Sequence, residues 1–502
     1  MNRREFAKAT AGLPFAAAAF DAPFDVSDRA QLFIDDVLVR EARSVWFRQH
    51  LAERHPANPL VRAEHPWEGW RLELYGNVIF DEEEKIFKMW YLAEGGGHFT
   101  GPYNTHYATS QDGIRWEKPL VGPLRTRSGE RTNALVEQQH LPSVMKDNRD
   151  PDPARRYKMI GWIDNPREAR GYHTMVSPDG IHWKPFSTSP IAPSADVITG
   201  YYDEQRKLYV AMPKIGTMVR GARRRVFYTI TSEDFVRWSR PEPAFFPDLR
   251  DDAGSLARIE ESRRLLDVPD DLAIMRTEFY GVGFYPAESC TLGFPWVFTI
   301  NNNARYGNHE GPFELQLAVT RDLKTWSRPF RVPCLAMGKP GAWDEGLVVT
   351  QSRALRVGDE IWLYYGGANY THGTPCLYRD IGRKTRYTGS IGLAKWKLDR
   401  FVSADGMSAE STLQTVPVTF SGDRLELNAA VLRSGRLTVE PLDAGMRPIE
   451  GFGPSEPVQG ANLRAVVKWK RGSIASLKGK PVALRFRLNG AQLFSFAFRK
   501  SG

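Results

Sequence analysis

A short motif that recurs along the chain is the feature that most constrains the fold. In its clearest form it reads Ser-x-Asp-Gly-x-x-Trp, and a strand-like segment precedes each copy. The four clear copies lie at residues 110–116, 177–183, 232–238 and 320–326, and a degraded fifth lies at 390–396. The Asp side chain can cap the backbone amides of a turn, and the Trp can pack against the next hairpin. The motif therefore predicts repeated hairpin turns, and we assign it no chemistry.

A second pattern precedes each turn: a strand, a polar turn and an aromatic-rich strand. Its five copies start at Gly76, Pro142, Asp196, Tyr280 and Val349. Period-two alternation of apolar and polar residues, with turns rich in Asp, Gly and Pro, indicates antiparallel strands. Five units of about four strands each predict an all-β fold, a five-bladed β-propeller, in which repetition around a channel leaves few open sheet edges.

The repeats also set the expected domain boundaries in a chain of 502 residues. We expect the propeller over residues 23–400, with a charged insertion near 248–272 that carries a helical stretch at 254–266. Insertions of this kind usually form rim loops. Beyond residue 400 the repeat stops, and closely spaced short strands predict a C-terminal β-sandwich over residues 401–502.

Residues 1–22 have the pattern of an export signal. Arg3 and Arg4 stand just ahead of the small, apolar run 9–20, which resembles a twin-arginine signal with a cleavage region at 17–22. The alternative is a short amphipathic N-terminal helix. No other stretch reaches the ~18 uninterrupted apolar residues of a membrane span. We therefore expect export to the periplasm or the extracellular space, and no membrane partner once the signal is removed.

Composition and charge argue against several other classes of protein. The net charge is only +9, and Lys and Arg are scattered among acids, so no nucleic-acid partner is expected. The densest basic run, Arg220 to Arg225, is interpreted as a solvated loop. Cysteines without C-x-x-C spacing and histidines without H-x-x-x-H spacing predict no transition-metal site, and we expect no cofactor. A structural cation in the channel is compatible with the sequence.

Acidic residues fall at the start of several predicted inner strands. The innermost strand of a propeller comes first in each blade, and its beginning faces the mouth of the channel. Such positions are held by Glu73, Asp196 and Glu278, by Asp344 and Glu345 before the fifth unit, and, on a weaker alignment, by Glu137. One explanation is that a water-filled channel merely solvates them. The other is a shared polar site, because two carboxylates about 5–10 Å apart are what glycosidic cleavage requires. We predict Glu73, Asp196 and Glu278 as the catalytic residues.

A site for sugar rings also needs aromatic platforms and hydrogen-bonding side chains. The segment 55–70 supplies them just ahead of the first unit, and Trp67 is favoured as a platform because Pro, Glu and Gly surround it. The glycine-rich segment 366–373 returns a polar loop to the same mouth. The predicted substrate-binding residues are Asn58, Trp67, Glu68, Asp344, Glu345 and His372.

Together these features resemble the five-bladed propeller glycoside hydrolases, the class of families 32 and 43 and their relatives. The resemblance rests on Asn58-Pro59 before the first blade, the acid-led inner strands and the Ser-x-Asp-Gly-x-x-Trp turns. A propeller followed by a β-sandwich is similar to family 32 especially. The Asn-Asp-Pro-Asn core of that family is absent, and Arg149-Asp150-Pro151 matches its Arg-Asp-Pro letters within a predicted turn.

The resemblance implies a role for each predicted acid. Glu73 or Glu68 is similar in position to the base or nucleophile of the first blade, Asp196 to the transition-state stabiliser, and Glu278 to the general acid. It implies an exported glycoside hydrolase that acts on a poly- or oligosaccharide, with a carbohydrate as its partner.

Three other functions stay open on the sequence. The turns are similar to the Asp box of sialidases, and Arg71, Arg276 and Arg305 could form their arginine triad, although sialidases have six blades. A glycoside phosphorylase of the same fold would need a phosphate site, for which Arg62 joins Arg71 and Arg276. A non-catalytic carbohydrate-binding propeller would carry aromatics at its mouth without paired acids.

Overall fold

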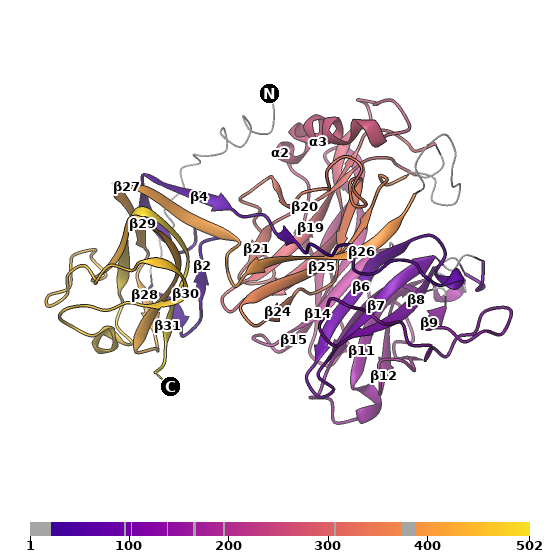
Figure 1. The fold of residues 1–502 in the computed structure, drawn as a ribbon, viewed down its shortest axis with the longest axis horizontal. Coiled ribbons are helices and arrows are strands. Elements are labelled where there is room, and N and C mark those ends of the chain that lie inside the picture. The colour runs from indigo at the N-terminus through magenta and orange to yellow at the C-terminus, as the bar shows by residue number, and fades with distance from the viewer. Residues whose placement is uncertain are drawn as a thin grey trace. The chain divides into compact units, whose positions relative to one another are not determined.

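The computed structural model describes residues 22–94, 97–101, 103–137, 139–163, 167–193, 196–305, 308–373 and 387–501. The chain divides into two compact units, which Figure 1 shows. One consists of Ala52–Pro286 and Leu292–Lys395, and the other of Met1–Leu51, Ala287–Thr291 and Trp396–Gly502. The predicted export signal lies outside the described residues except for its last position, so it stays a prediction.

The larger unit is an all-β, five-bladed propeller, as the repeats predict. The first blade is β6 (Leu72–Asp81), β7 (Ile86–Glu94), β8 (Tyr103–Ser110) and β9 (Ala134–Glu137). The second is β10 (Gln139–Lys146), β11 (Tyr157–Ile163), β12 (Gly171–Ser177) and β13 (Lys184–Pro185). The third is β14 (Ile198–Asp203), β15 (Leu208–Val219), β16 (Ala222–Ser232) and β17 (Glu242–Phe245). Within these three blades every pairing is antiparallel.

The last two blades carry small additions to the same plan. The fourth is β18 (Arg276–Pro286), β19 (Thr291–Ile300), β20 (Phe313–Gln316) and β22 (Pro333–Leu335), with β21 (Ala318–Thr320) also paired to β19. The fifth is β23 (Leu347–Thr350), β25 (Glu360–Ala368), β26 (Gly389–Lys397) and β5 (Glu53–Arg54), with β24 (Leu355–Val357) paired to β25. Because β5 comes from the start of the propeller sequence, its pairing with β26 ties the first segment to the last blade.

The first strand of every blade forms the inner ring. Strands β6, β10, β14, β18 and β23 contact one another in that order, and β23 contacts β6 to close the ring. An apolar cluster joins the first and fifth blades and includes Leu72, Leu74, Met89, Tyr364 and Leu393. The strand starts therefore meet around one centre, and this arrangement positions the predicted acids.

The recurring motif forms turns in which the Asp side chain caps the backbone. Asp112 Oδ1 accepts hydrogen bonds from the amides of Ile114 and Arg115, each at 2.8 Å. Trp116 Nε1 donates to the Gly113 carbonyl. The motifs around Asp179, Asp234 and Asp322 repeat the amide contacts. The predicted fifth copy at 390–396 is wrong, because those residues lie inside β26 and form no turn.

Removing one of these caps should destabilise the protein measurably. We expect Asp112→Ala to lower the free energy of unfolding by about 1–2 kcal/mol at pH 7, because two backbone amides lose their acceptor. Those amides hold the pKa of Asp112 below its usual range. The contribution is therefore present at neutral pH and is lost as the pH falls through the lowered pKa. Urea titration at pH 7 and pH 3 measures both effects, and an Asp112→Ala variant as stable as wild type at pH 7 would refute this account.

Buried ion pairs connect the first three blades at the ends of their inner strands. Asp81, at the end of β6, accepts hydrogen bonds from Lys88 Nζ at 2.9 Å, Lys146 Nζ at 2.6 Å and Tyr157 Oη at 2.6 Å. Lys146 and Tyr157 belong to the second blade, so this carboxylate joins two blades. The pattern recurs one blade further on, where Lys158 and Tyr209 donate to Asp147.

The smaller unit differs from the predicted domain boundary at residue 23. It contains β1 (Phe24–Ser27), β2 (Gln31–Leu32), β3 (Val39–Arg43) and β4 (Val45–Gln49), together with β27 (Val402–Thr415), β28 (Val418–Phe420), β29 (Arg424–Leu442), β30 (Gly460–Val466) and β31 (Ala483–Arg499). β3 and β4 pair with β27, and β2 pairs with β31. The sequence gives no local sign of this pairing, because the partners lie more than 350 positions apart.

The topology of the smaller unit is one seven-stranded sheet and a two-stranded parallel pair, β1 with β28. The long strands β27, β29 and β31 carry register shifts along their length, and β31 pairs with both β27 and β29 on either side of these shifts. An apolar core that includes Phe33, Leu413, Leu427, Phe486 and Phe496 fills the unit. The C-terminal residues thus form strands, with N-terminal strands built into the same unit, and the β-sandwich itself stays a prediction.

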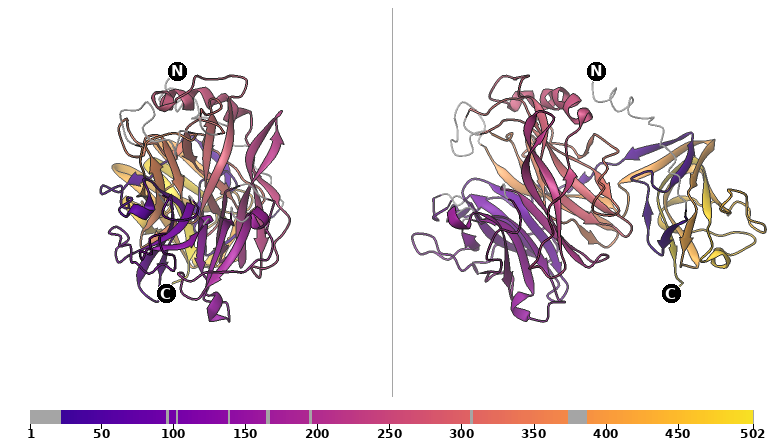
Figure 2. Two further views of the ribbon diagram at one scale, coloured as in Figure 1. Left: turned by 90° about the vertical axis from the view of Figure 1, so that its right-hand side faces the viewer. Right: turned by 180° about the vertical axis from the view of Figure 1, so that it is seen from behind.

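The predicted helical insertion is confirmed between β17 and β18. It comprises α2 (Leu249–Ala253), α3 (Ser255–Ser262) and the 3-10 turn η4 (Arg263–Leu265). Asp248 and Asp251 form a capping box at the start of α2, each carboxylate accepting the other residue's amide. The views in Figure 2 show both helices at one end of the propeller.

Two further sequence expectations concern membranes and cysteines. Within the described ranges, no helix is long and apolar enough to cross a membrane. Cys290 and Cys334 are buried, and Cys376 lies outside the described residues.

Candidate active site

Two of the predicted acids, Glu73 and Asp196, face one pair of tyrosines at the centre of the propeller. Glu73 is the second residue of β6, and Asp196 lies just before β14. Burial and the charges of both carboxylates raise the pKa values of Tyr75 and Tyr280 well above their usual range. Acids from the first and third blades therefore act on the same two phenols, which stay protonated and can donate hydrogen bonds near neutral pH.

Glu73 is held by a buried arginine that it shares with a second acid. Arg71 Nη1 lies 2.8 Å from Glu73 Oε1, and Arg71 Nε lies 3.1 Å from Glu94 Oε2. The same guanidinium donates to the Tyr370 hydroxyl at 3.0 Å. The Glu73 side chain is 12% exposed and the Glu94 side chain is 6% exposed. Glu73 is therefore the more accessible of the two acids. The trio carries one negative charge more than positive.

Asp196 forms an ion pair with a buried lysine. The Lys214 side chain on β15 is only 2% exposed, whereas that of Asp196 is 46% exposed and can reach a ligand. Lys214 Nζ lies 3.8 Å from the centre of the Tyr280 ring. Burial lowers the pKa of Lys214 to about 8, and the Asp196 carboxylate opposes part of that shift. The lysine is therefore charged at neutral pH and begins to lose its proton in mildly alkaline solution.

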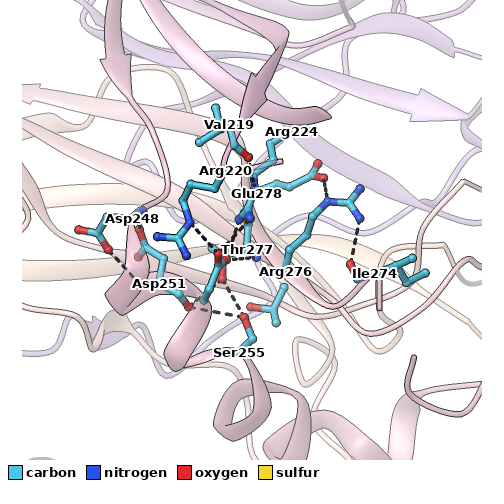
Figure 3. Close-up of polar contacts among 12 residues, drawn as sticks. Val219, Arg220, Arg224, Asp248, Asp251, Ser255, Ile274, Arg276, Thr277 and Glu278 are labelled. Atoms are coloured by element: carbon cyan, nitrogen blue, oxygen red, sulfur yellow. Dashed lines mark hydrogen bonds and ion pairs between the residues drawn. The ribbon is translucent and has the colours of Figure 1, made fainter. Parts of the chain in front are cut away.

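Glu278 occupies the predicted strand start but is fully engaged by two arginines. Its Oε2 accepts from Arg225 Nη1 at 2.6 Å, and its Oε1 accepts from Arg276 Nε at 2.8 Å. The side chain is 1% exposed. Figure 3 shows the Arg276 guanidinium between the Glu278 carboxylate and the Ile274 carbonyl. With both oxygens occupied and almost no exposure, Glu278 orients arginines in this structure and does not present the free carboxylic acid that a proton donor needs.

Two predicted substrate-binding residues, Trp67 and Glu68, are structural. Glu68 is fully buried, and its carboxylate accepts from Lys118, the Tyr91 hydroxyl and the amides of residues 64 and 65. Trp67 is 7% exposed, and its indole donates to Asn133 and stacks on His65. The prediction that these two residues contact a sugar is not supported, because their polar atoms already have protein partners.

Asn58 and Asp344 also serve the packing of the fifth blade. The Asn58 amide exchanges two hydrogen bonds with the backbone of Leu393 on β26, each at 2.9 Å. Asp344 is 1% exposed and accepts from Arg54 Nε and the Tyr365 hydroxyl, each at 2.8 Å. Asn58 and Asp344 therefore stabilise the packing of β5 and β26 in the fifth blade. Their polar atoms serve the fold, and the prediction that they bind substrate is not supported.

Glu345 and His372 also have partners within the protein. Glu345 pairs with Arg264 of the helical insertion and accepts from the Gly341 amide. The His372 ring packs 4.8 Å from the centre of Tyr280, and its Nδ1 lies 2.8 Å from the His309 carbonyl. Burial and the nearby Arg225 lower the pKa of His372 to about 3, so it stays neutral above mildly acidic pH. The His372 ring therefore packs against Tyr280 as a neutral side chain.

The weaker alignment of Glu137 is wrong. Glu137 ends β9, the outermost strand of the first blade, and its carboxylate accepts from the Thr100 amide. The second blade starts its inner strand at Gln139, which is neutral. Among the described residues, no group of three His, Cys, Asp or Glu side chains could hold a metal ion.

A cavity elsewhere in the propeller does not coincide with the acids. It has a volume of about 320 Å³ and is lined by residues that include Phe245, Asp248, Trp326, Arg328 and Arg331. Arg331 pairs with Asp248 and Asp251. None of the predicted catalytic acids lines this cavity, and its cations already have carboxylate partners, so we place the candidate site at Glu73 and Asp196.

Sequence reasoning missed Tyr75, Lys214 and Tyr280 as parts of the site. Each lies in the first or second strand of a blade, and the apolar residues around it in the sequence predict core packing. One signal was available for Lys214, because a lysine within the apolar run Leu208–Val219 must find a buried counter-charge. The tyrosines carry no such mark, since many aromatic residues of the propeller only pack.

Comparisons with known proteins give structural matches alone, since no family model and no curated protein matches the sequence. Beta-1,2-mannobiose phosphorylase from Listeria innocua is 13% identical, with 70% of this chain and 97% of that chain covered and a TM-score of 0.43. A thermostable family-43 glycoside hydrolase is 12% identical over 70% of this chain and 96% of its own, with a TM-score of 0.42. The solved structures that this chain matches thus include a family-43 glycoside hydrolase. At such values no activity or residue role is transferred from them.

Proposed function

We propose that the protein is a glycoside hydrolase in which Glu73 and Asp196 are the carboxylate pair. The observation that carries the proposal is that these two acids, from separate blades, both add to burial in raising the pKa values of Tyr75 and Tyr280. Lys214, the partner of Asp196, lies against the Tyr280 ring. A glycosidic bond is cleaved by one group that protonates the leaving oxygen and one that attacks or activates water. Two carboxylates beside protonated phenols supply these groups together with hydrogen-bond donors for sugar hydroxyls.

The charges around the two acids suggest a division of labour. Asp196 pairs with Lys214 and is more exposed than Glu73, so we assign it as the group that attacks the anomeric carbon or takes a proton from water. Glu73 shares Arg71 with Glu94 and is the more exposed of these two glutamates, so we assign Glu73 as the group that gives a proton to the leaving oxygen. In the reaction this proton passes to the leaving oxygen as the bond between that oxygen and the anomeric carbon breaks. Water supplies the hydroxyl of the new reducing end.

The experiment that tests this proposal is reducing-sugar release from a panel of polysaccharides and aryl glycosides. We expect wild type to release sugar from at least one substrate in phosphate-free buffer. The Glu73→Gln, Asp196→Asn double variant should release none while it stays folded, which its melting transition checks. Sugar binding without release by wild type would contradict the hydrolase and favour a binding propeller. Release that needs added phosphate would favour a phosphorylase.

We also propose that the protein is exported through the twin-arginine route. The support is the Arg3-Arg4 pair just ahead of the apolar run 9–20. Replacing both arginines by lysine should leave at least about nine-tenths of the protein in the cytoplasm of a bacterial host that has this pathway. Lys8→Arg, in the same segment, should still be exported. Cell fractionation with an immunoblot reads the outcome, and equal periplasmic amounts of the double-lysine variant and wild type would exclude the route.

A further inference from the structure

The basic run Arg220 to Arg225 is not the solvated loop that the sequence suggested. It forms the turn between β15 and β16 and the first residues of β16. Arg224 is 4% exposed, and its guanidinium binds both oxygens of Asp252 at 2.6 and 3.0 Å and donates to the Thr277 carbonyl. Because neighbours on a strand point to opposite faces, Arg225 points away from these contacts and reaches Glu278. Arg224 and Arg225 of this run therefore place two guanidinium groups in poorly solvated parts of the propeller.

The arginines of this region outnumber the acids that pair with them. Arg225 and Arg276 share the single carboxylate of Glu278. Arg220 and Arg224 likewise share Asp252. Figure 3 shows Arg220, Arg224 and Arg276 gathered around Thr277 and Glu278. Each group of two arginines and one acid carries one net positive charge, and the Arg225 and Arg276 side chains are only 16% and 13% exposed. A poorly solvated excess of positive charge attracts an anion.

Within the part of the chain that the structure describes, His309 faces the guanidinium groups of both Arg225 and Arg276. Both terminal nitrogens of Arg225 lie 3.5 Å from His309 Nδ1, and Arg276 Nη2 lies 3.3 Å from His309 Nε2. Burial and Arg225 lower the pKa of His309, so the ring is neutral and one of its nitrogens carries a hydrogen. A neutral imidazole accepts at only one nitrogen. One of the two guanidinium groups therefore faces an N–H group, which a carboxylate oxygen placed between them would correct.

The geometry also places this position next to the proposed catalytic pair. The Arg225 guanidinium lies 5.3 Å from the centre of the Tyr280 ring, and Lys214 Nζ lies 3.8 Å from the same ring. Lys214 in turn pairs with Asp196. A sugar held near Asp196 could thus extend an acidic substituent past Tyr280 to Arg225 and Arg276.

We infer that Arg225 and Arg276 form a subsite for the carboxylate of an acidic sugar, so that the substrate is a uronic-acid-containing saccharide. This inference rests on the proposed function and specifies its substrate class. A guanidinium fork binds a carboxylate through two parallel hydrogen bonds, and a carboxylate is the anionic group that a uronic acid carries on its own ring. The subsite binds and positions the sugar, and Glu278 holds both arginines in place.

The test compares ligands that differ only in the carboxylate. Calorimetric titration would use oligosaccharides of galacturonate and of glucuronate, their carboxyl-reduced neutral counterparts, and inorganic phosphate. We expect wild type to bind one acidic oligosaccharide at least about tenfold more tightly than its neutral counterpart, a ratio typical of a charge-assisted pair. Arg276→Gln and Arg225→Gln should each remove most of that preference. Arg223→Gln, an exposed neighbour in the same hairpin, should keep it.

Several results would overturn the inference. These are equal binding of the acidic and neutral oligosaccharides, no binding of either, phosphate binding in place of the acidic sugar, or an unchanged preference in both glutamine variants. Melting temperatures identify a variant that fails to fold, in which case Arg276→Lys, which keeps the charge but lacks the fork, should weaken the preference several-fold. Binding of the acidic sugar without cleavage would leave the subsite standing and refute the hydrolase. Cleavage of neutral saccharides alone would support the hydrolase and refute the subsite.

Discussion

Replacing Lys214 by methionine is expected to lower kcat by about 100-fold or more while the protein stays folded. Methionine fills a similar apolar volume, but it removes the cation that faces the Asp196 carboxylate. Loss of one fixed charge at a reacting group typically costs about 100- to 1,000-fold in rate. Because Asp196 is 46% exposed, water can solvate it in the variant, and the melting temperature should change little.

The pH dependence distinguishes this role from a merely structural one. The pKa of Lys214 is lowered to about 8, so wild-type activity should decline as the pH rises through about 8. The stability effect of the same group has the opposite sign. Between its folded pKa and its usual value near 10.5, the unfolded chain binds more protons, so this group's contribution to stability rises with pH. Activity lost above pH 8 without unfolding would identify the lysine.

The controls for this prediction are straightforward. Lys184→Met removes an exposed lysine on β13 and should leave kcat and the pH profile unchanged. The Lys214→Met variant should lose the decline above pH 8 that wild type shows. A kcat within threefold of wild type, with the same alkaline decline, would show that Lys214 has no part in the reaction.

The second large effect concerns stability, because Asp81 joins the first two blades. Asp81→Ala is expected to lower the free energy of unfolding by about 3 kcal/mol, because it removes the buried carboxylate that Lys88 and Lys146 share. Each lysine then keeps one partially exposed acid as its partner, Glu84 for Lys88 and Glu83 for Lys146. The Lys88 and Lys146 side chains are 3% and 11% exposed, and Asp81 is fully buried. Urea titration at pH 7 measures the change.

An exposed acid in the same turn provides the matched control. Glu82 is 76% exposed and pairs only with the exposed Lys85, so Glu82→Ala should change stability by less than about 0.5 kcal/mol. If Asp81→Ala were no more destabilising than Glu82→Ala, the network of Lys88, Lys146 and Tyr157 would not couple the blades.

The fold could be predicted because the sequence repeats it. Each turn motif is local: Asp112 contacts amides two and three residues ahead, so the letters alone specify the contact. The order of strands in a blade follows from these turns. The pairing of β2–β4 with β27 and β31 could not be predicted, because no local pattern links strands from the two ends of the chain.

The candidate site was only partly predictable for a related reason. Position in a blade placed Glu73 and Asp196 correctly at the centre, since inner strands begin there. The same rule could not distinguish a free acid from one that is already paired, as Glu278 and Asp344 are. Their arginine partners come from β16, β18 and β5, and such partners emerge only when the blades are assembled.

The most direct test of the central claim is the rate of aglycone release by two single variants on whichever aryl glycoside wild type cleaves. Glu73→Gln and Asp196→Asn should each be slower than wild type by about 1,000-fold or more, because each removes one member of a cooperating pair. The double variant should be little slower than the slower single variant. Glu345→Gln, an acid of the same rim outside the pair, should stay within tenfold of wild type. If either Glu73→Gln or Asp196→Asn kept more than a tenth of the wild-type rate, the assignment of the carboxylate pair would be wrong.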